Sequence, residues 1–443
     1  MMQLAKAVSS VLETTKQGTE IHVRWPWVEA SVWTERMLTA LENGVKGGKW
    51  FSLMDKVYAM NTLQAAWQQV AKNKGSHGVD GMSIERFAAN QERYLKELHE
   101  ALKNGSYQPL PVKRVYIPKS DGKQRPLGIP AVKDRVVQAA LKMVIEPIFE
   151  RDFVEHSYGF RPGRGCKDAL RSVDGMLKEG GVWVVDADMK SYFDTIPHDK
   201  LMEQVETRIS DGRVLELIKR FLKQNIMEGM QEWTPAGGTP QGAVISPLLA
   251  NLYLHPLDKQ MQDAGLRMVR YADDFVILCH SEVEAQQALS PVREWVTANG
   301  LTLHPDKTHV GNCMEIGQGF EFPGYRFEGG KRLVRKKSLK ALKDKIRSKT
   351  KRSRGVSIER IIQDLNPMLR GWFNYFKHAH RRTFPEIDGF VRRRLRSLRY
   401  KQKTGRSFFG KSHHVHKMFP NAYFAAYGLF TMTEAYAVAR QPR

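Results

Sequence analysis

Cysteine and long apolar runs are both scarce in this sequence of 443 residues. Cys166, Cys279 and Cys313 lie far apart and form no Cys-x-x-Cys pair, which argues against a disulfide framework and against a zinc module. No apolar run reaches the length of a transmembrane helix, and the first residues lack the apolar core of a secretion signal. We therefore expect a cytoplasmic protein that has no membrane partner.

Acidic residues are scarce in the last quarter of the chain. Residues 331–443 contain 30 Lys and Arg but only 6 Asp and Glu, whereas the first 330 residues contain 40 and 41. The whole excess of positive charge, +23 at neutral pH, therefore lies in this last quarter. Aromatic residues are interleaved with the cations there, which argues against a disordered tail. A near-neutral body with a basic, folded appendage is typical of a protein that neutralises the phosphate groups of nucleic acid.

The sequence does contain a pair of adjacent carboxylates inside an apolar stretch. Asp273 and Asp274 are flanked on both sides by β-branched and aromatic residues, which predicts two strands joined near the acidic pair. Burying two adjacent carboxylates is unfavourable unless cations neutralise them. The pair therefore indicates either a divalent metal site with oxygen ligands or an exposed Asp-Asp turn, and the pair alone does not decide between them.

A second strand end also carries acidic residues. The apolar run at 182–185 leads directly into Asp186-Ala187-Asp188. Because side chains alternate along a strand, Asp186 and Asp188 face the same way, and either of them could join the acidic pair around metals. The alternative is that one of them caps a helix that follows a buried strand.

Residues 112–130 predict a β-hairpin with an Asp-Gly turn. Lys119, Lys123 and Arg125 place three cations on it, which suits a polyanionic small ligand such as a triphosphate. The alternative is an exposed sheet edge that is protected by charge. A glycine-rich basic loop follows at 157–165, and its glycines would let the loop approach a nucleic-acid backbone closely.

These segments belong to an ordered series of motifs that spans most of the chain. In chain order the series reads Ile-Pro-Lys and Arg-Pro-Leu-Gly-Ile-Pro on the hairpin, Gly-Phe-Arg-Pro, Asp-x-Asp-x-Lys-x-x-Phe-Asp, Pro-Gln-Gly before Ser-Pro-Leu, Tyr-Ala-Asp-Asp, a leucine strand before Lys307, and Phe-x-Gly-Tyr. Tyr-Ala-Asp-Asp alone is short and has many chance matches, but the whole series in this order and spacing is specific. The chain resembles a group II intron-encoded reverse transcriptase and maturase.

The resemblance implies an α+β fold. It would be a right-hand polymerase with fingers, a palm built on an antiparallel sheet backed by helices, and an α-helical thumb or maturase domain. The implied domains are an N-terminal extension at 1–50, fingers at 51–180, a palm at 181–330, a thumb at 331–400 and a short basic DNA-binding-like tail at 401–443. The basic last quarter predicts helices at 338–350, 358–378 and 384–400. The endonuclease that ends some members of the family is not expected.

The resemblance also implies phosphoryl transfer by two metal ions, with Mg²⁺ as the expected cofactor. Matched residue by residue, the catalytic metal ligands are Asp188, Asp273 and Asp274, with the backbone carbonyl of Met189 as a further ligand. Asp186 competes with Asp188 by strand geometry, but the family pattern favours the second Asp of the motif. We expect Asp273 to bridge both metals with Asp188, and Asp274 to be the ligand whose replacement leaves some activity.

Further residues match positions that contact substrates in this family. The implied nucleotide-binding residues are Lys119, Arg125, Phe193 and Gln241. The implied primer- or template-contacting residues are Arg161, Tyr271, Gly324 and Tyr325. The ring of Phe193 would leave no room for a 2′-hydroxyl group and would thereby select deoxynucleotides. Pro323 departs from the leucine more usual in the family, so the resemblance does not define the shape of the turn at 322–325.

The function implied by the resemblance is that of a protein which binds its intron RNA and assists splicing. It would also copy that RNA into DNA from a DNA primer with deoxynucleoside triphosphates. Two alternatives stay open: an intron-like reverse transcriptase with a host role in DNA repair or phage defence, and a splicing-only RNA-binding maturase. The complete carboxylate set argues against the second alternative. The oligomeric state, the primer source and the cognate intron do not follow from the sequence.

Overall fold

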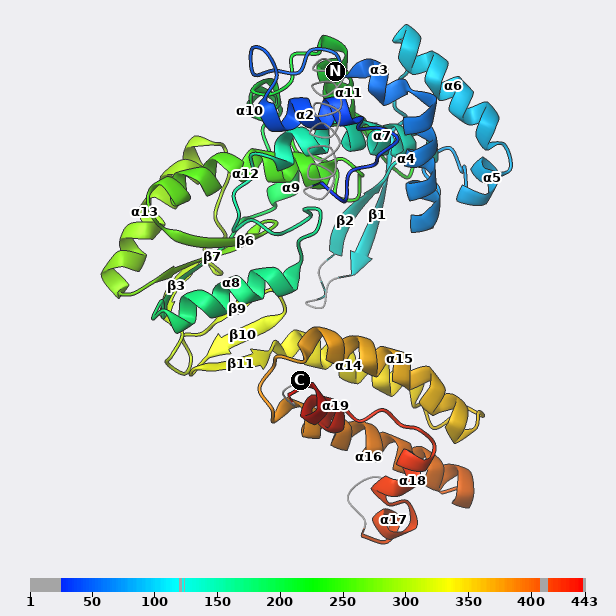
Figure 1. Cartoon of the computed structure of the whole chain (residues 1–443). Coiled ribbons are helices and arrows are strands. Elements are labelled where there is room, and N and C mark those ends of the chain that lie inside the picture. The colour runs from blue at the N-terminus through cyan, green and yellow to red at the C-terminus, as the bar shows by residue number, and fades with distance from the viewer. Residues whose placement is uncertain (1–24, 119–121, 123, 407–412, 441–443) are drawn as a thin grey trace, which may run out of the picture. The chain divides into compact units, whose positions relative to one another are not determined.

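The structure is a computed structural model that describes residues 25–118, 122, 124–406 and 413–440. Residues 1–24 of the expected N-terminal extension lie outside this description. The chain divides after Val310 into two compact units (Figure 1). The domain borders expected at 330 and 400 do not coincide with this division. Residue 330 lies in the turn between two paired strands, and residue 400 lies inside a helix that continues to Thr404.

The first unit is built around one long, buried helix. Its helices are α2 (Glu35–Asn43), α3 (Met54–Tyr58), α4 (Met60–Asn73), α5 (Ile84–Ala88), α6 (Gln91–Asn104), α7 (Val132–Glu150), α8 (Cys166–Lys178), α9 (Tyr192–Thr195), α10 (His198–Glu206), α11 (Gly212–Leu222), α12 (Ser246–Asp263) and α13 (Glu282–Ala298). Helix α7 is apolar on nearly all sides, so it packs against α3, α4, α6 and α12 instead of showing one face to water. The apolar core is continuous from these helices to the strands of the same unit.

One four-stranded sheet of the first unit has the order β2-β1-β4-β5. Its strands are β1 (Val112–Pro118), β2 (Gln124–Ile129), β4 (Ile226–Glu228) and β5 (Gln231–Trp233). Strand β1 pairs antiparallel with β2, which confirms the predicted hairpin, and it pairs parallel with β4. The hairpin cations Lys119 and Lys123 lie outside the described residues.

A second four-stranded sheet carries the acidic strand ends and has the order β6-β7-β3-β8. Its strands are β3 (Trp183–Asp188), β6 (Arg267–Tyr271), β7 (Asp274–Cys279) and β8 (His309–Asn312). Strand β7 is antiparallel to both β6 and β3. Helices α8, α12 and α13 pack against these strands. The expected palm, an antiparallel sheet backed by helices, is thereby confirmed.

The second unit combines a small sheet with helices. Its three-stranded sheet has the order β11-β10-β9 and consists of β9 (Phe320–Phe322), β10 (Tyr325–Glu328) and β11 (Lys331–Val334). The next helices are α14 (Lys336–Lys349), α15 (Ile358–Phe376) and α16 (Thr383–Thr404). They confirm the three helices that the sequence predicted in this region.

The described part of the expected basic tail is built into the second unit. It forms α17 (His413–Met418), α18 (Asn421–Ala426) and α19 (Met432–Ala439). Asp388 of α16 accepts hydrogen bonds from the backbone N–H groups of Met432 and Thr433, at 3.0 and 2.9 Å. The rings of Phe384 and Tyr436 lie 4.8 Å apart. Across the described ranges, none of the helices has both the length and the apolar character that a membrane span requires.

Candidate active site

The acidic pair lies at a tight hairpin between β6 and β7. Tyr271 pairs with Asp274, so Ala272 and Asp273 form a two-residue turn. Ala272 has a φ of 60°, the left-handed conformation that such turns require and that glycine adopts most easily. The predicted strand-turn-strand is confirmed, with Asp273 half-buried in the turn and Asp274 exposed at the start of β7.

Asp188 faces the acidic hairpin from the neighbouring strand. In the register of β3 and β7, Asp188 is the direct partner of Asp274, and direct partners lie on the same face of a sheet. Asp186 is instead the partner of Val276, two residues farther from the turn. Burial raises the pKa of Asp273, and the negative charge of Asp188 raises it further. Asp188 and Asp273 therefore lie close enough to repel each other, and Asp274 lies beside Asp188 in the sheet.

Lys307 is the cation that these carboxylates share. Its ammonium group donates a hydrogen bond to Asp188 Oδ2, and Asp274 and Asp273 add electrostatic attraction. Partial burial would lower the pKa of Lys307, but the Asp188 carboxylate outweighs this effect, and the pKa is raised. The loop that carries the lysine is fixed to β3, because the backbone N–H of His304 donates to the carbonyl oxygen of Asp188 at 2.7 Å.

The donor set suits a divalent metal, although the side chains do not form a closed cage. Carboxylate oxygens are ligands that Mg²⁺ prefers, and the raised pKa of Asp273 indicates a local excess of negative charge. Among the residues that the structure describes, no three His, Cys, Asp or Glu side chains converge as a metal site requires. Asp188 contacts Lys307 instead. The backbone of Met189, the further ligand expected, pairs with Leu303 beside this site.

Arg270 braces the acidic hairpin, and the sequence did not predict this role. Its side chain is 1% exposed, and its Nε donates to Asp258 Oδ1 of α12 at 2.6 Å. It also donates to Asn251 Oδ1 and to the carbonyl oxygen of Ala272, each at 2.9 Å. Burial would lower the pKa of Arg270, but the Asp258 carboxylate more than offsets it, so the pKa is raised and the guanidinium stays charged. A lone arginine inside an apolar strand was the available signal.

The glycine-rich loop at 157–165 packs along β6. The backbone N–H of Tyr158 donates to the carbonyl oxygen of Arg270 at 2.9 Å. A Cβ atom on Gly159 would stand 2.2 Å from the backbone nitrogen of Ala272, so only glycine fits against the acidic turn. The glycine in this loop therefore serves a close approach to the protein's own backbone.

Arg161 was expected to contact primer or template, and its position in the structure argues for a different role. Its side chain is 2% exposed and forms an ion pair with Glu150 at 2.8 Å. It also donates to the carbonyl oxygens of Val154 and Ser157, at 2.5 and 2.6 Å. We therefore correct the expectation: Arg161 holds its loop in shape, because the buried carboxylate and the loop carbonyls occupy its guanidinium.

Arg125 and Gln241 lie together near the carboxylates. Arg125 Nε donates to Gln241 Oε1 at 2.7 Å, and Gln241 Nε2 donates to Asp194 Oδ2 at 3.2 Å. The charge of Arg125 also acts on Asp273 and opposes the rise in its pKa. A hairpin cation, a loop amide and the acidic turn thus belong to one site. Lys119, the other expected phosphate-binding residue, lies outside the described residues.

Phe193 lies in the short helix α9 and is only 8% exposed. Its ring faces that of Phe160 edge-on at 6.3 Å, and Phe160 is 48% exposed. Phe160, Ser191 and Ala272 are three of the four non-glycine residues with left-handed backbone in the described chain. Each such residue costs about 1–3 kcal/mol and persists where the surrounding structure holds it. This strain is concentrated around the candidate site.

Tyr271 ends β6 opposite Asp274 and is half-buried. Burial raises the pKa of Tyr271 to about 12, and a hydrogen bond with Cys166 adds to the rise. The phenol therefore stays protonated at neutral pH and remains a hydrogen-bond donor beside the acidic turn.

The expected primer-contacting turn lies in the second unit, and only part of it is accessible. Gly324 occupies the turn between β9 and β10 with a φ of 84°. Tyr325 is completely buried, and its hydroxyl donates to the carbonyl oxygen of Tyr375 at 2.7 Å. The hydroxyl of Tyr375 in turn donates to the carbonyl oxygen of Pro323 at 2.9 Å. We therefore correct the role of Tyr325: it ties the turn to α15 and does not reach nucleic acid.

Carboxylates at the ends of adjacent antiparallel strands, next to a cationic hairpin, define the palm of a template-directed nucleic-acid polymerase. The family described as "Reverse transcriptase (RNA-dependent DNA polymerase)" matches residues 117–342. The family described as "Group II intron, maturase-specific domain" matches residues 339–417. The chain therefore belongs to the reverse transcriptase family, as an RNA-directed DNA polymerase of the group II intron type. The resemblance found in the sequence is confirmed.

The chain is also similar to individual proteins. The chain is 37% identical over 317 residues to Protein YkfC of Escherichia coli (strain K12), a match that covers 62% of this chain and 81% of YkfC. It is 40% identical over 195 residues to the group II intron-encoded protein LtrA of Lactococcus lactis subsp. cremoris, covering 44% of this chain and 32% of LtrA. The solved structure "Partial Cas6-RT-Cas1--Cas2 complex" matches at 25% identity and a TM-score of 0.36, over 56% of this chain and 41% of that chain.

Proposed function

We propose that this chain copies an RNA template into DNA by extending a primer 3′-hydroxyl with deoxynucleoside triphosphates. The observation that carries the proposal is the strand pairing that sets Asp188 opposite Asp274, with Asp273 in the adjoining turn. Phosphoryl transfer of this kind uses carboxylates from neighbouring strands to hold metal ions around the reacting phosphate. This chain supplies such carboxylates next to a basic hairpin.

Members of the reverse transcriptase family use divalent metal ions, and we propose two Mg²⁺ ions held by Asp188, Asp273, Asp274 and the backbone carbonyl of Met189. Bound there, the ions would activate the primer hydroxyl and neutralise charge that develops on the phosphate. The chain's own part is to hold the ligands in place. Arg270 does so by donating to the carbonyl oxygen of Ala272 in the acidic turn.

The nucleotide-binding residues support the same reaction. The guanidinium of Arg125 suits phosphate oxygens because it presents several N–H donors in one plane. Gln241, to which Arg125 donates, would border the templating base. Phe193 would lie under the sugar, where its ring excludes a 2′-hydroxyl group. Lys119 would add a second cation to the triphosphate site.

The second unit carries the other half of the proposal. We propose that it binds intron RNA, assists its splicing, and presents it for copying onto a DNA primer at the target site during intron mobility. The match to the maturase-specific domain at 339–417 supports this role. Residues 331–443 contain 30 Lys and Arg against 6 Asp and Glu, and this excess supplies the positive charge that RNA binding needs.

A primer-extension assay tests the polymerase function. Wild-type protein with an RNA template, a DNA primer, deoxynucleotides and Mg²⁺ should synthesise DNA. Asp273→Ala should abolish synthesis, whereas Asp263→Ala, at an exposed position of α12, should not. Failure of the wild-type protein to synthesise DNA under these conditions would sink the proposal.

A splicing assay tests the second half. Precursor RNA that contains the intron surrounding the gene should splice faster with the wild-type protein than without it. Asp273→Ala should retain this effect, because the replaced carboxylate lies in the first unit. An unchanged splicing rate with wild-type protein would contradict the maturase role.

A further inference from the structure

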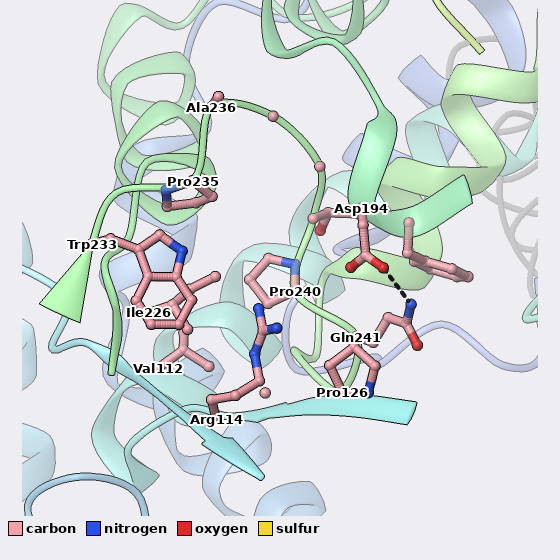
Figure 2. Close-up of a pocket in the computed structure, with 15 residues that line it drawn as sticks. Val112, Arg114, Pro126, Asp194, Ile226, Trp233, Pro235, Ala236, Pro240 and Gln241 are labelled. Carbon is pink, nitrogen blue, oxygen red and sulfur yellow. Dashed lines mark hydrogen bonds between the residues drawn. The ribbon is translucent and has the colours of Figure 1, made fainter. Parts of the chain in front are cut away.

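A pocket of about 430 Å³ lies beside the β1–β2 hairpin (Figure 2). Its walls come from one face of the hairpin, from Trp233 at the end of β5, and from the segment 235–241. In the view of Figure 2, Arg114 stands between the Trp233 ring on one side and Asp194 and Gln241 on the other. The pocket is therefore formed by elements that are distant in sequence and that surround a single open space.

The pocket adjoins the candidate nucleotide site, because Phe193, Asp194 and Gln241 also line it. Arg114 and Gly128 are direct partners, and together with Pro126 they line the pocket. Because side chains alternate along a strand, these residues share one face of the hairpin, while Arg125 belongs to the other face. The charge of Arg125 acts on Asp273. A ligand at Arg114 and a triphosphate at Arg125 would therefore contact opposite faces of the hairpin, and Gln241, which accepts a hydrogen bond from Arg125, would border both.

The lining suits a planar aromatic ring joined to one phosphate group. Trp233 is 38% exposed, and the guanidinium carbon of Arg114 lies 5.6 Å from its ring centroid. Within the described residues, Arg114 has no acidic partner, and it is the one cation that lines the pocket. Pro126 and Pro240 add flat apolar surfaces, and Asp194, which accepts a hydrogen bond from Gln241, also lines the pocket. A single cation matches one phosphate group better than a triphosphate.

We infer that this pocket holds an unpaired nucleobase of the RNA template, the nucleotide that follows the one being copied. The base stacks on Trp233, and its phosphate contacts Arg114. Stacking on an aromatic ring tolerates every base, because every base has a π-face, and a copying enzyme needs this tolerance. Trp233 lies outside every motif of the ordered series. The inference rests on the proposed polymerase function and adds a template subsite to it.

Crosslinking tests the position of the base without any need for synthesis. An RNA template carries 5-iodouridine at the position directly after the templating nucleotide, and the complex with primer and protein is irradiated. The crosslinked peptide should contain Trp233. Moving the label to the templating position should remove this crosslink. A crosslink confined to the peptide that contains Arg125, or no crosslink to the Trp233 peptide, would overturn the inference.

Kinetics test how much the stacking of the template base on Trp233 contributes to DNA synthesis. With template nucleotides beyond the one being copied, Trp233→Ala should lower kcat/KM by about tenfold, the effect expected for one lost base–aromatic stack. Opposite the last template nucleotide, where no base can enter the pocket, the same variant should match the wild type. Trp233→Phe should recover most of the loss. Met230→Ala, on the same β4–β5 hairpin but fully exposed, should have no effect at either position.

The outcomes separate this inference from the proposed function. Equal losses at both template positions would mean that the pocket serves the incoming nucleotide or the fold, and would overturn the inference. No loss at either position would also overturn the inference. Absence of synthesis by the wild-type protein would instead count against the polymerase proposal, while the crosslink could still be read.

Arg114→Gln provides a second, independent variant. It should weaken binding of a template with an overhang and reduce the salt dependence of that binding, because one phosphate contact is lost. Binding of a template that ends at the copied nucleotide should stay unchanged. Equal weakening of both templates would contradict the contact between Arg114 and the overhang.

Discussion

In the first unit, charged side chains near the candidate site are buried as ion pairs. The basic part of the second unit instead carries an excess of positive charge. Arg270 and Asp258 are each 1% exposed, and Arg161 with Glu150 is nearly as buried. Residues 331–443, by contrast, hold 30 Lys and Arg against 6 Asp and Glu. A buried pair fixes the geometry of its neighbours, while surplus surface charge attracts phosphates without fixing one geometry. The comparison suggests chemistry in the first unit and RNA binding in the second.

The basic excess of the second unit is not all directed outward. Three arginines of α16 donate hydrogen bonds within the unit, namely Arg394, Arg396 and Arg399, whose acceptors lie on Thr350, Phe419 and Tyr423. The exposed cations of α14 are Lys336, Lys337, Lys340 and Lys345, together with Arg347. A count of cations from the sequence therefore overstates the positive charge that is available to bind phosphate groups. We expect many of the contacts with RNA phosphates to be made by α14.

Replacing one candidate metal ligand should distinguish DNA synthesis by the first unit from RNA binding by the second unit. Asp188→Ala should reduce DNA synthesis by at least about a thousandfold, because a metal ligand is lost from the phosphoryl-transfer site. Affinity for intron RNA should stay the same. Primer extension and RNA-binding titration measure the two properties on one preparation.

Two neighbouring positions serve as controls for that experiment. Asp186→Asn, on the same face of β3 but farther from the turn, should keep most activity. Asp274→Ala should leave more activity than Asp188→Ala. A loss of RNA affinity by Asp188→Ala equal to its loss of synthesis would break the comparison between the units.

Breaking a buried pair should destabilise only the first unit. Arg270→Met leaves the buried Asp258 carboxylate uncompensated, which should cost about 3–5 kcal/mol of unfolding free energy. Urea unfolding followed by hydrogen exchange assigns the change to a unit. Lys259→Met breaks an exposed pair with Asp263 and should change stability by less than about 0.5 kcal/mol. Similar losses from both variants would contradict the role given to burial.

The first unit should also respond to pH through Asp134. This side chain is 1% exposed, and burial is the main cause that raises its pKa to about 6, although Tyr107 donates to it at 2.6 Å. A raised pKa means that stability is fully present below pH about 4 and is lost as pH rises through about 6, by about 3 kcal/mol at most. Asp134→Asn should flatten the dependence of the urea midpoint on pH in this window. A slope unchanged from the wild type would refute the assignment.

Sugar selection should depend on the first unit alone. Phe193→Val opens space under the sugar, so incorporation of ribonucleotides relative to deoxynucleotides should rise by about tenfold or more. Competition between the two nucleotides in primer extension measures the ratio. Phe160→Val, at the ring that contacts Phe193 edge-on, should have a smaller effect. Unchanged selectivity in Phe193→Val would count against the gate.

The smallest effect is expected from surface charge on the second unit. Replacing Lys336 and Lys340 with Gln should flatten the plot of log affinity for RNA against log salt by about 0.7 per lysine. Stability should not change, because both side chains are exposed. The matched variant replaces Lys72 and Lys96, which are exposed on the first unit. Equal changes in slope from the two variants would show that both units bind RNA alike.

Much of this molecule follows from local sequence patterns. The hairpin at 112–130, the strands around Asp273 and the helices between 336 and 404 could be predicted because alternation, helical spacing and turn residues act over short distances. The order and spacing of the motifs also pointed to the family. The resemblance grouped Asp188 with Asp273 and Asp274, and the register of β3 and β7 sets Asp188 opposite Asp274.

The tertiary structure decided which polar side chains face inward. Arg161 and Tyr325 match motif positions, yet packing buries both, and their polar groups bind the protein itself. The contact of Lys307 with Asp188, and the brace of Arg270 on the acidic turn, join residues that no short pattern connects. Sequence alone determined the family, most of the elements and the candidates for the reactive residues, because these depend on residue type and spacing. Only the tertiary structure decided burial, partners and the pocket beside Trp233, because these depend on elements that meet through folding.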